Sequence, residues 1–525
     1  MDCYNFLIVG SGPSGIAAAR VLENHGACLV DAGDGPEEEF PYARLTDALT
    51  AGDIPSLLGK QWETLANIRN PHAMHAKLRA RCVRYAARGE PFQVHGASGK
   101  ILLRGAGSYA AGGLSNTWGA QLVRYTEADL AVAGGWPVSA AELAPWYDDL
   151  ERHIGITGAK DDMYGFLGDA QNLLPPLSLA PCAAYLLRRY TSCRAQGKEP
   201  RVLLGRPRLA VLTTPYDGRA PYRYGETELF ATGQDGIYTA KHTLNVLRER
   251  KRITLFGRHK VLSFAETAEH VSVELLDIER DEKFFVRAKH LLLGCGAIHT
   301  ARLILLHHND TRTALPFLDH PPTLLPIFFP CMFGSALPSG SFPVQLAATL
   351  NDSSSRVMVS LYYPGSVLRS DLLPQTPLPM SFSLRLFKNL FGGMLVAQIW
   401  ETSCPSSDSS LQIDASGAVR IRYAGNLSST ALPALVRAFR ALGGWSLSRW
   451  ADTPQPGWGF HYAACLPMRS NPERYETHAD GRLWNSRRVR VIDASVLPSL
   501  PAKNHSFTAM ANAARIAGEV SRCEC

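Results

Sequence analysis

The sequence lacks the features that would place the chain in or across a membrane. No apolar run approaches the roughly 20 residues that a membrane-spanning helix needs. The chain also starts without a basic segment followed by a removable apolar stretch, because Phe6 to Val9 lead directly into a glycine-rich turn. These absences predict a soluble protein in the cytoplasm.

Two further absences concern metals and nucleic acids. Eleven cysteines lie between Cys3 and Cys525 without any CxxC pair, which fits reduced thiols better than a disulfide framework or a metal site. Lysine and arginine form no block, and a formal net charge of +7 is small for 525 residues, so nucleic-acid binding has little support. A basic surface for an acidic substrate, carrier or partner protein is kept as an alternative.

The composition is that of a globular protein, with 46% hydrophobic and 19% charged residues. A chain of 525 residues is long enough for about two domains of ordinary size, each with its own core. One domain could therefore bind a cofactor and the other a substrate.

The start of the chain carries a dinucleotide-binding pattern. An apolar strand precedes an alanine-rich helix, a second short strand ends at Asp31 and Ala32, and the turn between the first strand and the helix reads Gly10-Ser11-Gly12-Pro13-Ser14-Gly15. In such a site Gly10 permits the tight turn, Gly12 lets the backbone approach the pyrophosphate, and Gly15 lets the helix pack closely on the strand. Asp31 is placed to accept hydrogen bonds from the ribose hydroxyls. The pattern does not distinguish FAD from NAD, and an ordinary βαβ turn is the alternative.

Two internal segments resemble the glucose-methanol-choline (GMC) family of flavin oxidoreductases. Residues 111–119 (AGGLSNTWG) are similar to the glycine-serine loop that wraps the isoalloxazine ring in this family, where glycines let the main chain lie close to a flat ring. Residues 291–297 (LLLGCGA) resemble the strand and glycine turn that close the nucleotide domain. The block after Trp136 resembles the shorter bacterial members related to pyranose oxidase, gluconate dehydrogenase and cholesterol oxidase.

Two later segments complete the resemblance, which runs from residue 4 to about residue 520. His461, with Met468 seven residues further on, is similar to the active-site block of the family, although Ala464 and Cys465 replace its glycine and threonine. Residues 489–498 and 504–511 match the terminal strand, the acid that contacts FAD, the catalytic position and the final helix of the family.

The resemblance implies an α/β fold, in which a Rossmann-like FAD-binding domain is joined to an α+β substrate domain with an antiparallel sheet over the flavin. The FAD-binding domain would be discontinuous, formed by residues 1–155, 235–310 and 456–525, and residues 156–234 and 311–455 would form the substrate-binding domain. The residues expected to bind FAD are Gly10, Gly12, Pro13, Ser14, Gly15, Asp31, Ala32, Gly112, Gly113, Ser115, Asn116, Thr117, Trp118, Gly119, Val261, Cys295, Gly296, Asp493, Ala494, His505, Ser506 and Phe507.

One departure concerns the attachment of the cofactor. Pyranose oxidase-like members attach FAD covalently through a histidine just before the tryptophan of the glycine-serine loop, and this sequence has Thr117 there. The resemblance therefore implies that FAD is bound noncovalently.

The expected chemistry is removal of a hydride from an alcohol-like carbon of a small molecule, with dioxygen or another electron acceptor. Flavin accepts the hydride, and the protein must manage the hydroxyl proton, a task suited to a histidine with a pKa near neutrality. We assign that role to His461, as a base or a positioning group, with Asn504 as its hydrogen-bonding partner. His505 is interpreted as solvent-facing or structural. Lyase or photochemical decarboxylase chemistry on the same fold, and an electron-transfer subunit, are the alternatives.

Overall fold

The computed structural model describes residues 3–33, 89–132, 135–224, 235–335, 341–352, 357–364, 389–423, 429–453 and 459–524, with the single residues 379, 382, 386 and 457. All residues assigned to a site from the sequence lie within these ranges. Three larger sheets and one two-stranded sheet are built from this part of the chain.

A seven-stranded sheet carries the start of the chain at its centre. Its parallel part has the order β8-β2-β1-β11-β19, and β11 continues through an antiparallel meander with β10 and β9. The strands are β1 (Cys3–Val9), β2 (Ala27–Asp31), β8 (Thr254–Gly257), β9 (His259–Glu266), β10 (Val271–Asp277), β11 (Glu282–Leu293) and β19 (Val489–Val491). β2 and the second half of β1 are buried, as expected for parallel strands covered on both faces.

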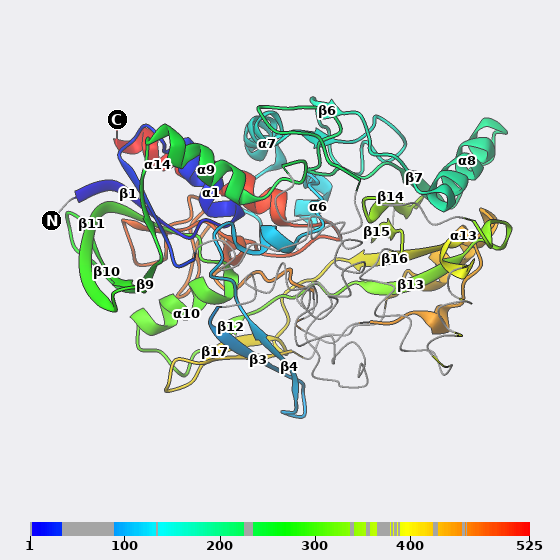
Figure 1. Ribbon diagram of the computed structural model, residues 1–525. Coiled ribbons are helices and arrows are strands. Elements are labelled where there is room, and N and C mark those ends of the chain that lie inside the picture. The colour runs from blue at the N-terminus through cyan, green and yellow to red at the C-terminus, as the bar shows by residue number, and fades with distance from the viewer. Residues whose placement is uncertain are drawn as a thin grey trace.

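Helices cover both faces of this sheet. The helices α1 (Pro13–Val21), α9 (Ala240–Arg250) and α14 (Ser506–Glu524) lie together on one side, and α10 (Ala297–His307) lies on the other (Figure 1). A Cβ atom at Gly15 would lie 1.8 Å from the carbonyl oxygen of Gly10, so α1 can approach β1 this closely only with glycine at that position.

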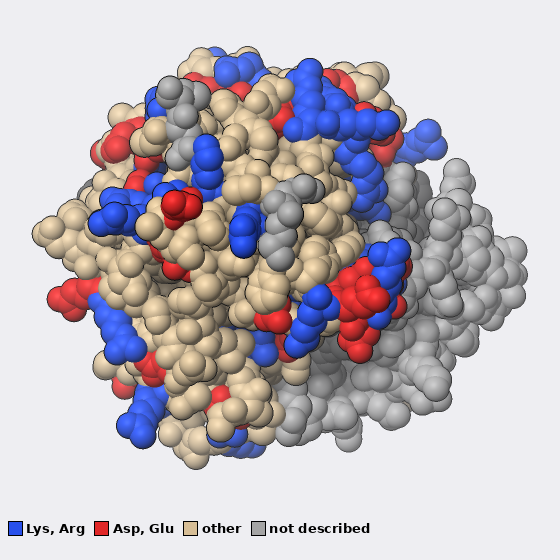
Figure 2. Space-filling model, turned by 90° about the vertical axis from the view of Figure 1, so that its left-hand side faces the viewer, with Lys and Arg blue, Asp and Glu red and all other residues tan. Residues whose placement is uncertain are grey.

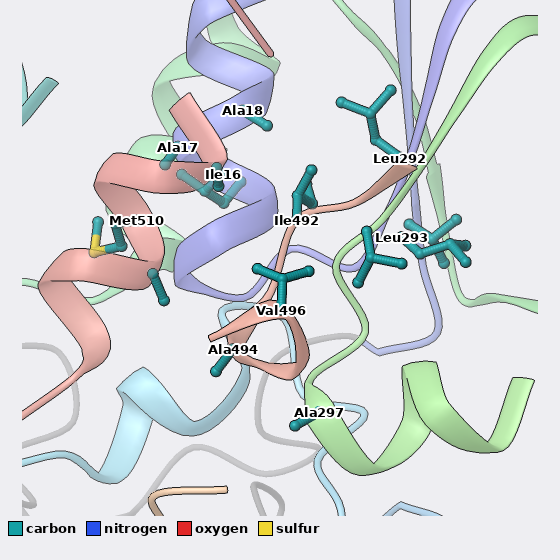
Figure 3. Packing of buried hydrophobic residues seen from close by; sticks show 14 of the residues in the cluster. Ile16, Ala17, Ala18, Leu292, Leu293, Ala297, Ile492, Ala494, Val496 and Met510 are labelled. Atoms are coloured by element: carbon teal, nitrogen blue, oxygen red, sulfur yellow. The ribbon is translucent and has the colours of Figure 1, made fainter. Parts of the chain in front are cut away.

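Segments from distant parts of the sequence meet in one core beneath these helices. Figure 3 shows Ile16 and Ala18 of α1, Leu293 at the end of β11, Ile492 after β19 and Met510 of α14 packed around a common interior. The early glycine turn and the last helix therefore belong to the same structural unit.

A five-stranded antiparallel sheet forms the other half of the molecule, with the order β13-β16-β15-β14-β7. Its strands are β7 (Val202–Gly205), β13 (Thr323–Phe328), β14 (Val344–Leu350), β15 (Val357–Tyr362) and β16 (Met394–Glu401). The helices α8 (Pro181–Ala195) and α13 (Leu432–Ala441) bury apolar side chains against one face. This sheet corresponds to the antiparallel sheet expected over the flavin.

The remaining elements connect the two halves. A third sheet, of order β12-β17-β18-β3-β4, contains β3 (Pro91–His95), β4 (Ile101–Ala106), β12 (Leu315–Pro316), β17 (Ser410–Ile413) and β18 (Val419–Arg422), and β5 (Ile156–Thr157) pairs with β6 (Leu173–Leu174). The other helices are α6 (Glu127–Ala131), α7 (Ala140–Ile154) and the 3₁₀ helices η3 (Gly113–Thr117), η5 (Pro330–Met332), η7 (Ser448–Trp450) and η8 (Ala494–Val496). The domain boundaries expected from the sequence stay a prediction.

The surface carries charges of both signs. On the face seen in Figure 2, lysine and arginine side chains are interspersed with aspartate and glutamate. The alternative of a basic surface for an acidic substrate, carrier or partner protein stays a prediction. Within the described ranges, no helix is both long enough and apolar enough to cross a membrane.

Candidate active site

Three neighbouring cavities, each sharing lining residues with the next, follow one another from the seven-stranded sheet to the antiparallel sheet. The first, of about 100 Å³, lies at the ends of β1 and β2 and is called the strand-end cavity. The second, the central cavity, measures about 210 Å³ and shares Gly10, Asp31 and Cys295 with the first. The third, the sheet-side cavity of about 150 Å³, shares Pro13 and Phe460 with the second. A row of this kind suits an elongated ligand with chemically distinct ends.

The strand-end cavity contains the acid at the end of β2. Asp31 accepts hydrogen bonds from the main-chain N–H groups of Ser11, at 2.6 Å, and Gly33, at 2.8 Å, so its carboxylate holds the glycine turn as well as lining the cavity. Ala32 and Val261 line the same cavity. Three of the residues expected to bind FAD, Asp31, Ala32 and Val261, are thus brought together.

Several groups in the strand-end cavity were missed by the sequence analysis. Glu90 accepts hydrogen bonds from Tyr109, at 2.7 Å, and from Lys260. Burial alone would raise the pKa of Glu90, but the hydrogen bonds from Lys260 and Tyr109 outweigh it and lower the pKa to about 2. His299 lies beside them, and burial lowers its pKa to about 4, so its imidazole is neutral at pH 7. No sequence motif joins these residues, which come from separate elements.

The central cavity receives three helix N-termini. Pro13 of α1, Ala297 of α10 and Ser506 of α14 are the first residues of their helices, and all three line it. The free N–H groups and the positive dipole ends at helix N-termini favour anions, above all phosphates. A pyrophosphate in the central cavity would therefore be stabilised from three directions.

Asp493 ties two of the segments around the central cavity together. Its carboxylate accepts hydrogen bonds from the main-chain N–H of Gly296, at 2.9 Å, from the Thr300 hydroxyl, at 2.5 Å, and from the main-chain N–H of Ser495, at 2.9 Å. Burial raises the pKa of Asp493 above its usual range. Ala494 and Cys295 line the cavity beside it.

The glycine-serine loop is held against the first glycine turn and α9. The Ser11 hydroxyl accepts a hydrogen bond from the Gly112 N–H, at 2.9 Å, and the Ser115 hydroxyl accepts one from the Ala240 N–H, at 2.9 Å. Trp118 donates through Nε1 to the carbonyl of Tyr238, at 2.8 Å. The loop residues that line the central or sheet-side cavity are Gly113, Leu114, Ser115, Thr117, Trp118 and Gly119.

Four of the residues expected to bind FAD do not line any of the three cavities. Gly15 and Phe507 are packing positions, since Gly15 meets Gly10 and the ring of Phe507 lies 4.9 Å from that of Tyr147. Asn116 donates to the carbonyls of Ala111 and Gly113, and Gly112 takes part in the contact with Ser11. These four residues do not line the cavities and instead pack against or hydrogen-bond to neighbouring residues.

His461 and Asn504 lie side by side in the sheet-side cavity, as the sequence predicts. The Asn504 Nδ2 atom is 3.5 Å from His461 Nε2, and Asn504 directly precedes α14. The His461 ring is stacked on Trp400 of β16, with ring centroids 4.6 Å apart and an angle of 19° between the planes. The antiparallel sheet therefore fixes the ring plane of His461.

Two more histidines surround His461. The rings of His505 and His320 lie 4.9 Å and 5.8 Å from it. Burial lowers the pKa of His320 to about 4 and that of His505 to about 3, so both imidazoles are neutral at pH 7. His505 is only 7% exposed and lines the central cavity, so the solvent-facing interpretation of it is wrong.

The sheet-side cavity also contains polar side chains that the sequence analysis did not single out. Gln121, Tyr362 and Gln398 line it, and the Gln121 amide donates to the Tyr362 hydroxyl at 3.1 Å. Tyr362 belongs to β15 and Gln398 to β16. Alternation along these strands could have indicated which residues share a face, but not that this face meets His461.

The three cavities are lined by buried polar atoms that have no hydrogen-bond partner in the described part of the chain. They are Ser108 Oγ, His299 Nε2, His505 Nδ1, Asn504 Oδ1 and Trp400 Nε1. Because an unsatisfied buried polar atom is costly, such atoms in a functional cavity indicate a polar ligand that satisfies them. Together with the three helix N-termini, they fit an elongated dinucleotide such as FAD.

Comparison with known proteins finds a family match in the last part of the chain. The family model described as GMC oxidoreductase matches residues 453–513, the segment that holds His461, Asp493 and Asn504. Members of this family are flavoproteins that use FAD, in agreement with the row of cavities.

Relatives and solved structures extend the comparison. The chain is 30% identical to paromamine 6'-oxidase from Streptomyces fradiae over 210 residues, which span 38% of this chain and 36% of that relative. Its fold matches pyridoxine 4-oxidase from Mesorbium loti with a TM-score of 0.60 at 17% identity, covering 99% of each chain. It also matches formate oxidase from Aspergillus oryzae RIB40, a structure that concerns FAD modification, with a TM-score of 0.62 at 13% identity, covering 100% of this chain and 98% of that one. The fold class predicted from the sequence is confirmed.

Proposed function

We propose that this protein is a GMC oxidoreductase that uses FAD to remove a hydride from the CH–OH carbon of a small molecule. The observation that carries the proposal is the position of His461 and Asn504 at the far end of a row of cavities that begins at the dinucleotide turn. FAD has the same order of parts, with adenosine at one end and the flavin ring at the other.

The protein residues expected to hold FAD follow from the three cavities. Asp31 and Val261 would meet the adenosine, and the N-termini of α1, α10 and α14 would meet the pyrophosphate. The glycine-serine loop would lie along the flavin ring in the sheet-side cavity. When bound there, FAD supplies a hydride acceptor, a function that protein side chains cannot provide.

His461 and Asn504 would act on the substrate hydroxyl. Of the three clustered histidines, His320 and His505 are held neutral by burial, whereas His461 lines the sheet-side cavity and is only half-buried. His461 would take up the hydroxyl proton, and Asn504 would position the oxygen through its amide. General-base help of this kind is typically worth roughly 10² to 10⁴-fold in rate.

FAD is proposed to be held noncovalently. The Thr117 side chain stands where a histidine carries the flavin in the pyranose oxidase-like members, and its hydroxyl donates to the Leu114 carbonyl at 3.2 Å. A hydroxyl bonded in this way is neither a strong nucleophile nor free to attack the flavin. Acid precipitation should release all of the yellow colour into the supernatant, and colour retained in the pellet would contradict the proposal.

The substrate class is proposed as a small polar alcohol. The described lining of the sheet-side cavity includes amide and hydroxyl groups from Gln121, Gln398 and Tyr362, which can hydrogen-bond to a polar substrate. The relatives are named for paromamine and pyridoxine, so these two compounds and simple sugars form the first screen. Oxygen consumption in the presence of each compound identifies the substrate if the enzyme is an oxidase, and a dye acceptor replaces dioxygen if it is a dehydrogenase.

The test of the catalytic assignment is His461→Ala compared with His270→Ala. His270 lies at the turn between β9 and β10, on the opposite half of the molecule from the sheet-side cavity, and is a matched control. With the best compound of the screen, anaerobic reduction of the flavin should slow by at least roughly 100-fold in His461→Ala and stay unchanged in the control, with FAD content equal in both. Normal reduction in His461→Ala would remove His461 from the mechanism.

The same measurement separates the alternatives. A lyase or a photochemical decarboxylase would turn over its substrate without net bleaching of the flavin by an alcohol in the dark. An electron-transfer subunit would stay oxidised under anaerobic conditions until its partner protein is added. Bleaching by an alcohol alone contradicts both.

A further inference from the structure

A buried carboxylate lies behind the loop that carries His461. Asp319 has no exposed surface and lies between β12 and β13. It accepts hydrogen bonds from the main-chain N–H groups of His320, at 2.9 Å, Gly457, at 2.7 Å, and Gly459, at 3.4 Å, and from that of His461. One side chain is thus the common acceptor for the segment that ends at the expected catalytic residue.

The backbone around Asp319 is shaped to allow this contact. A Cβ atom at Gly459 would lie 2.3 Å from the Asp319 Oδ1 atom, so only glycine lets the two approach. Phe460, between Gly459 and His461, adopts a left-handed conformation with φ of 55°, which a side chain rarely takes unless its surroundings impose it. Leu318 and Ala463 exchange main-chain hydrogen bonds of 3.0 and 3.1 Å on the far side of His461. The segment is therefore clamped before and after the histidine.

Among the described residues, no Lys or Arg side chain forms an ion pair with Asp319, so its charge acts on His461 without being cancelled. Its four described donors are main-chain amides, which leave a full negative charge in place, unlike an Arg or Lys side chain. Only Cα and Cβ separate the bonded nitrogen of His461 from its imidazole. A carboxylate at that separation, inside the protein, favours the protonated imidazole.

The other titratable groups around Asp319 and His461 do not cancel the effect of the Asp319 charge on the protonation of His461. His320 and His505 are neutral at pH 7, as described above. The phenols of Tyr423 and Tyr462 have pKa values raised by burial, with the Asp319 charge adding to it, so both stay neutral. The Glu401 carboxylate, at the end of β16, accepts hydrogen bonds from the Ser429 hydroxyl, at 3.0 Å, and from the main-chain N–H groups of Thr430 and Ala431.

We propose that Asp319 is a positioning residue that fixes the imidazole of His461 in the sheet-side cavity and raises its affinity for a proton. The catalytic meaning of this inference rests on the proposed function, because it makes His461 a better acceptor for the substrate proton. Asp319 itself neither gains nor loses a proton in that step. Burial raises the pKa of Asp319 to about 6, so the carboxylate is charged at pH 7 and above.

The experiment measures the protonation of His461 directly. Diethyl pyrocarbonate modifies neutral imidazoles, and peptide mass mapping of FAD-loaded protein follows the rate at His461 between about pH 5 and pH 8. In Asp319→Asn, which keeps the shape but loses the charge, the apparent pKa of His461 should fall by roughly 1 unit. Asp319→Glu should recover part of the shift, and the exposed control Asp408→Asn should show none.

A second variant covers the case in which Asp319→Asn does not fold. Gly459→Ala pushes the loop away from the carboxylate, and the pKa of His461 should fall in this variant too. A His461 profile identical to that of the wild type, in folded Asp319→Asn or in Gly459→Ala, overturns the inference. The experiment does not measure turnover, so it can be separated from a test of the proposed function. If the proposed function were wrong and this inference right, the pKa of His461 would still fall in Asp319→Asn, although the protein would oxidise no alcohol.

Discussion

Gly12 and Gly15 stand three residues apart in the same turn, and the structure predicts opposite consequences for adding a methyl group to each. At Gly12 the new Cβ would meet no protein atom within 4 Å, and φ of −63° is accessible to alanine. At Gly15 the Cβ would lie 1.8 Å from the Gly10 carbonyl oxygen. Gly12 faces the central cavity, whereas Gly15 faces the strand.

The magnitudes follow from these contacts. Gly12→Ala loses only the modest preference for glycine at a helix N-cap, so the free energy of unfolding of the apoprotein should fall by less than about 1 kcal/mol. The methyl would hold a phosphate away from the backbone and remove one or two charge-assisted hydrogen bonds, which costs about 2 kcal/mol or more, roughly a 30-fold increase in the Kd for FAD. Gly15→Ala must separate α1 from β1 and should lower the stability of the apoprotein by about 3 kcal/mol or more.

Two assays check this pair of variants. Urea unfolding of the flavin-free protein gives the free energy of unfolding, and the quenching of flavin fluorescence during titration gives the Kd. If Gly12→Ala bound FAD as tightly as the wild type, the turn would not approach the cofactor and the dinucleotide interpretation would be refuted. Equal losses of stability in both variants would refute the packing role assigned to Gly15.

Other predictions concern buried polar groups. His299→Leu removes an unsatisfied nitrogen from the strand-end cavity, so the apoprotein should be at least as stable in urea while FAD binding weakens by about 1 kcal/mol, several-fold in Kd; unchanged Kd would show that His299 does not meet the cofactor. Lys503, next to Asn504, forms a buried ion pair with Asp129, and Lys503→Met should lower the free energy of unfolding by about 3 to 5 kcal/mol, with recovery when Asp129→Leu is added; a loss below about 1 kcal/mol would contradict the pairing. The pKa of Asp319 is raised by folding, so its contribution to stability is complete below its usual pKa and is lost as the pH rises through about 6; relative to Asp319→Asn, the wild type should lose up to about 3 kcal/mol of unfolding free energy between about pH 4 and pH 7, and parallel pH profiles would contradict the burial effect.

The parts of the fold that were predictable are those in which the backbone itself sets the residue type. Gly10 adopts a positive φ, and Gly15 lies in close contact with the backbone of Gly10, so both positions require glycine. These two requirements produce a spacing of glycines that can be recognised in a single sequence. The segment around Asp493 and Asn504 was recognisable through its resemblance to the GMC family. The same resemblance paired His461 with Asn504, although more than forty positions separate them.

The rest of the site depends on packing between distant elements, which leaves no local pattern. The sequence indicates no role for His299, because nothing near it in the sequence shows that Gly107 leaves space for its ring. His505 looks polar and terminal in the sequence, yet tertiary contacts bury it. The role of Asp319 could not be predicted from the sequence, since its partners are main-chain amides that any sequence could supply.

The packing of the last helix on the first has a consequence for biosynthesis. β19 extends the sheet that contains β1, and α14 lies against α1, so the nucleotide-binding unit lacks one strand and one helix until residues 489–524 have left the ribosome. β1 can pair with β2 early in translation, but its other neighbour, β11, is made only when residues 282–293 have been translated. Tight binding of a dinucleotide is therefore expected only after residues 489–524 have been made, and the supply of free FAD from that moment should govern how much of the newly made protein escapes aggregation.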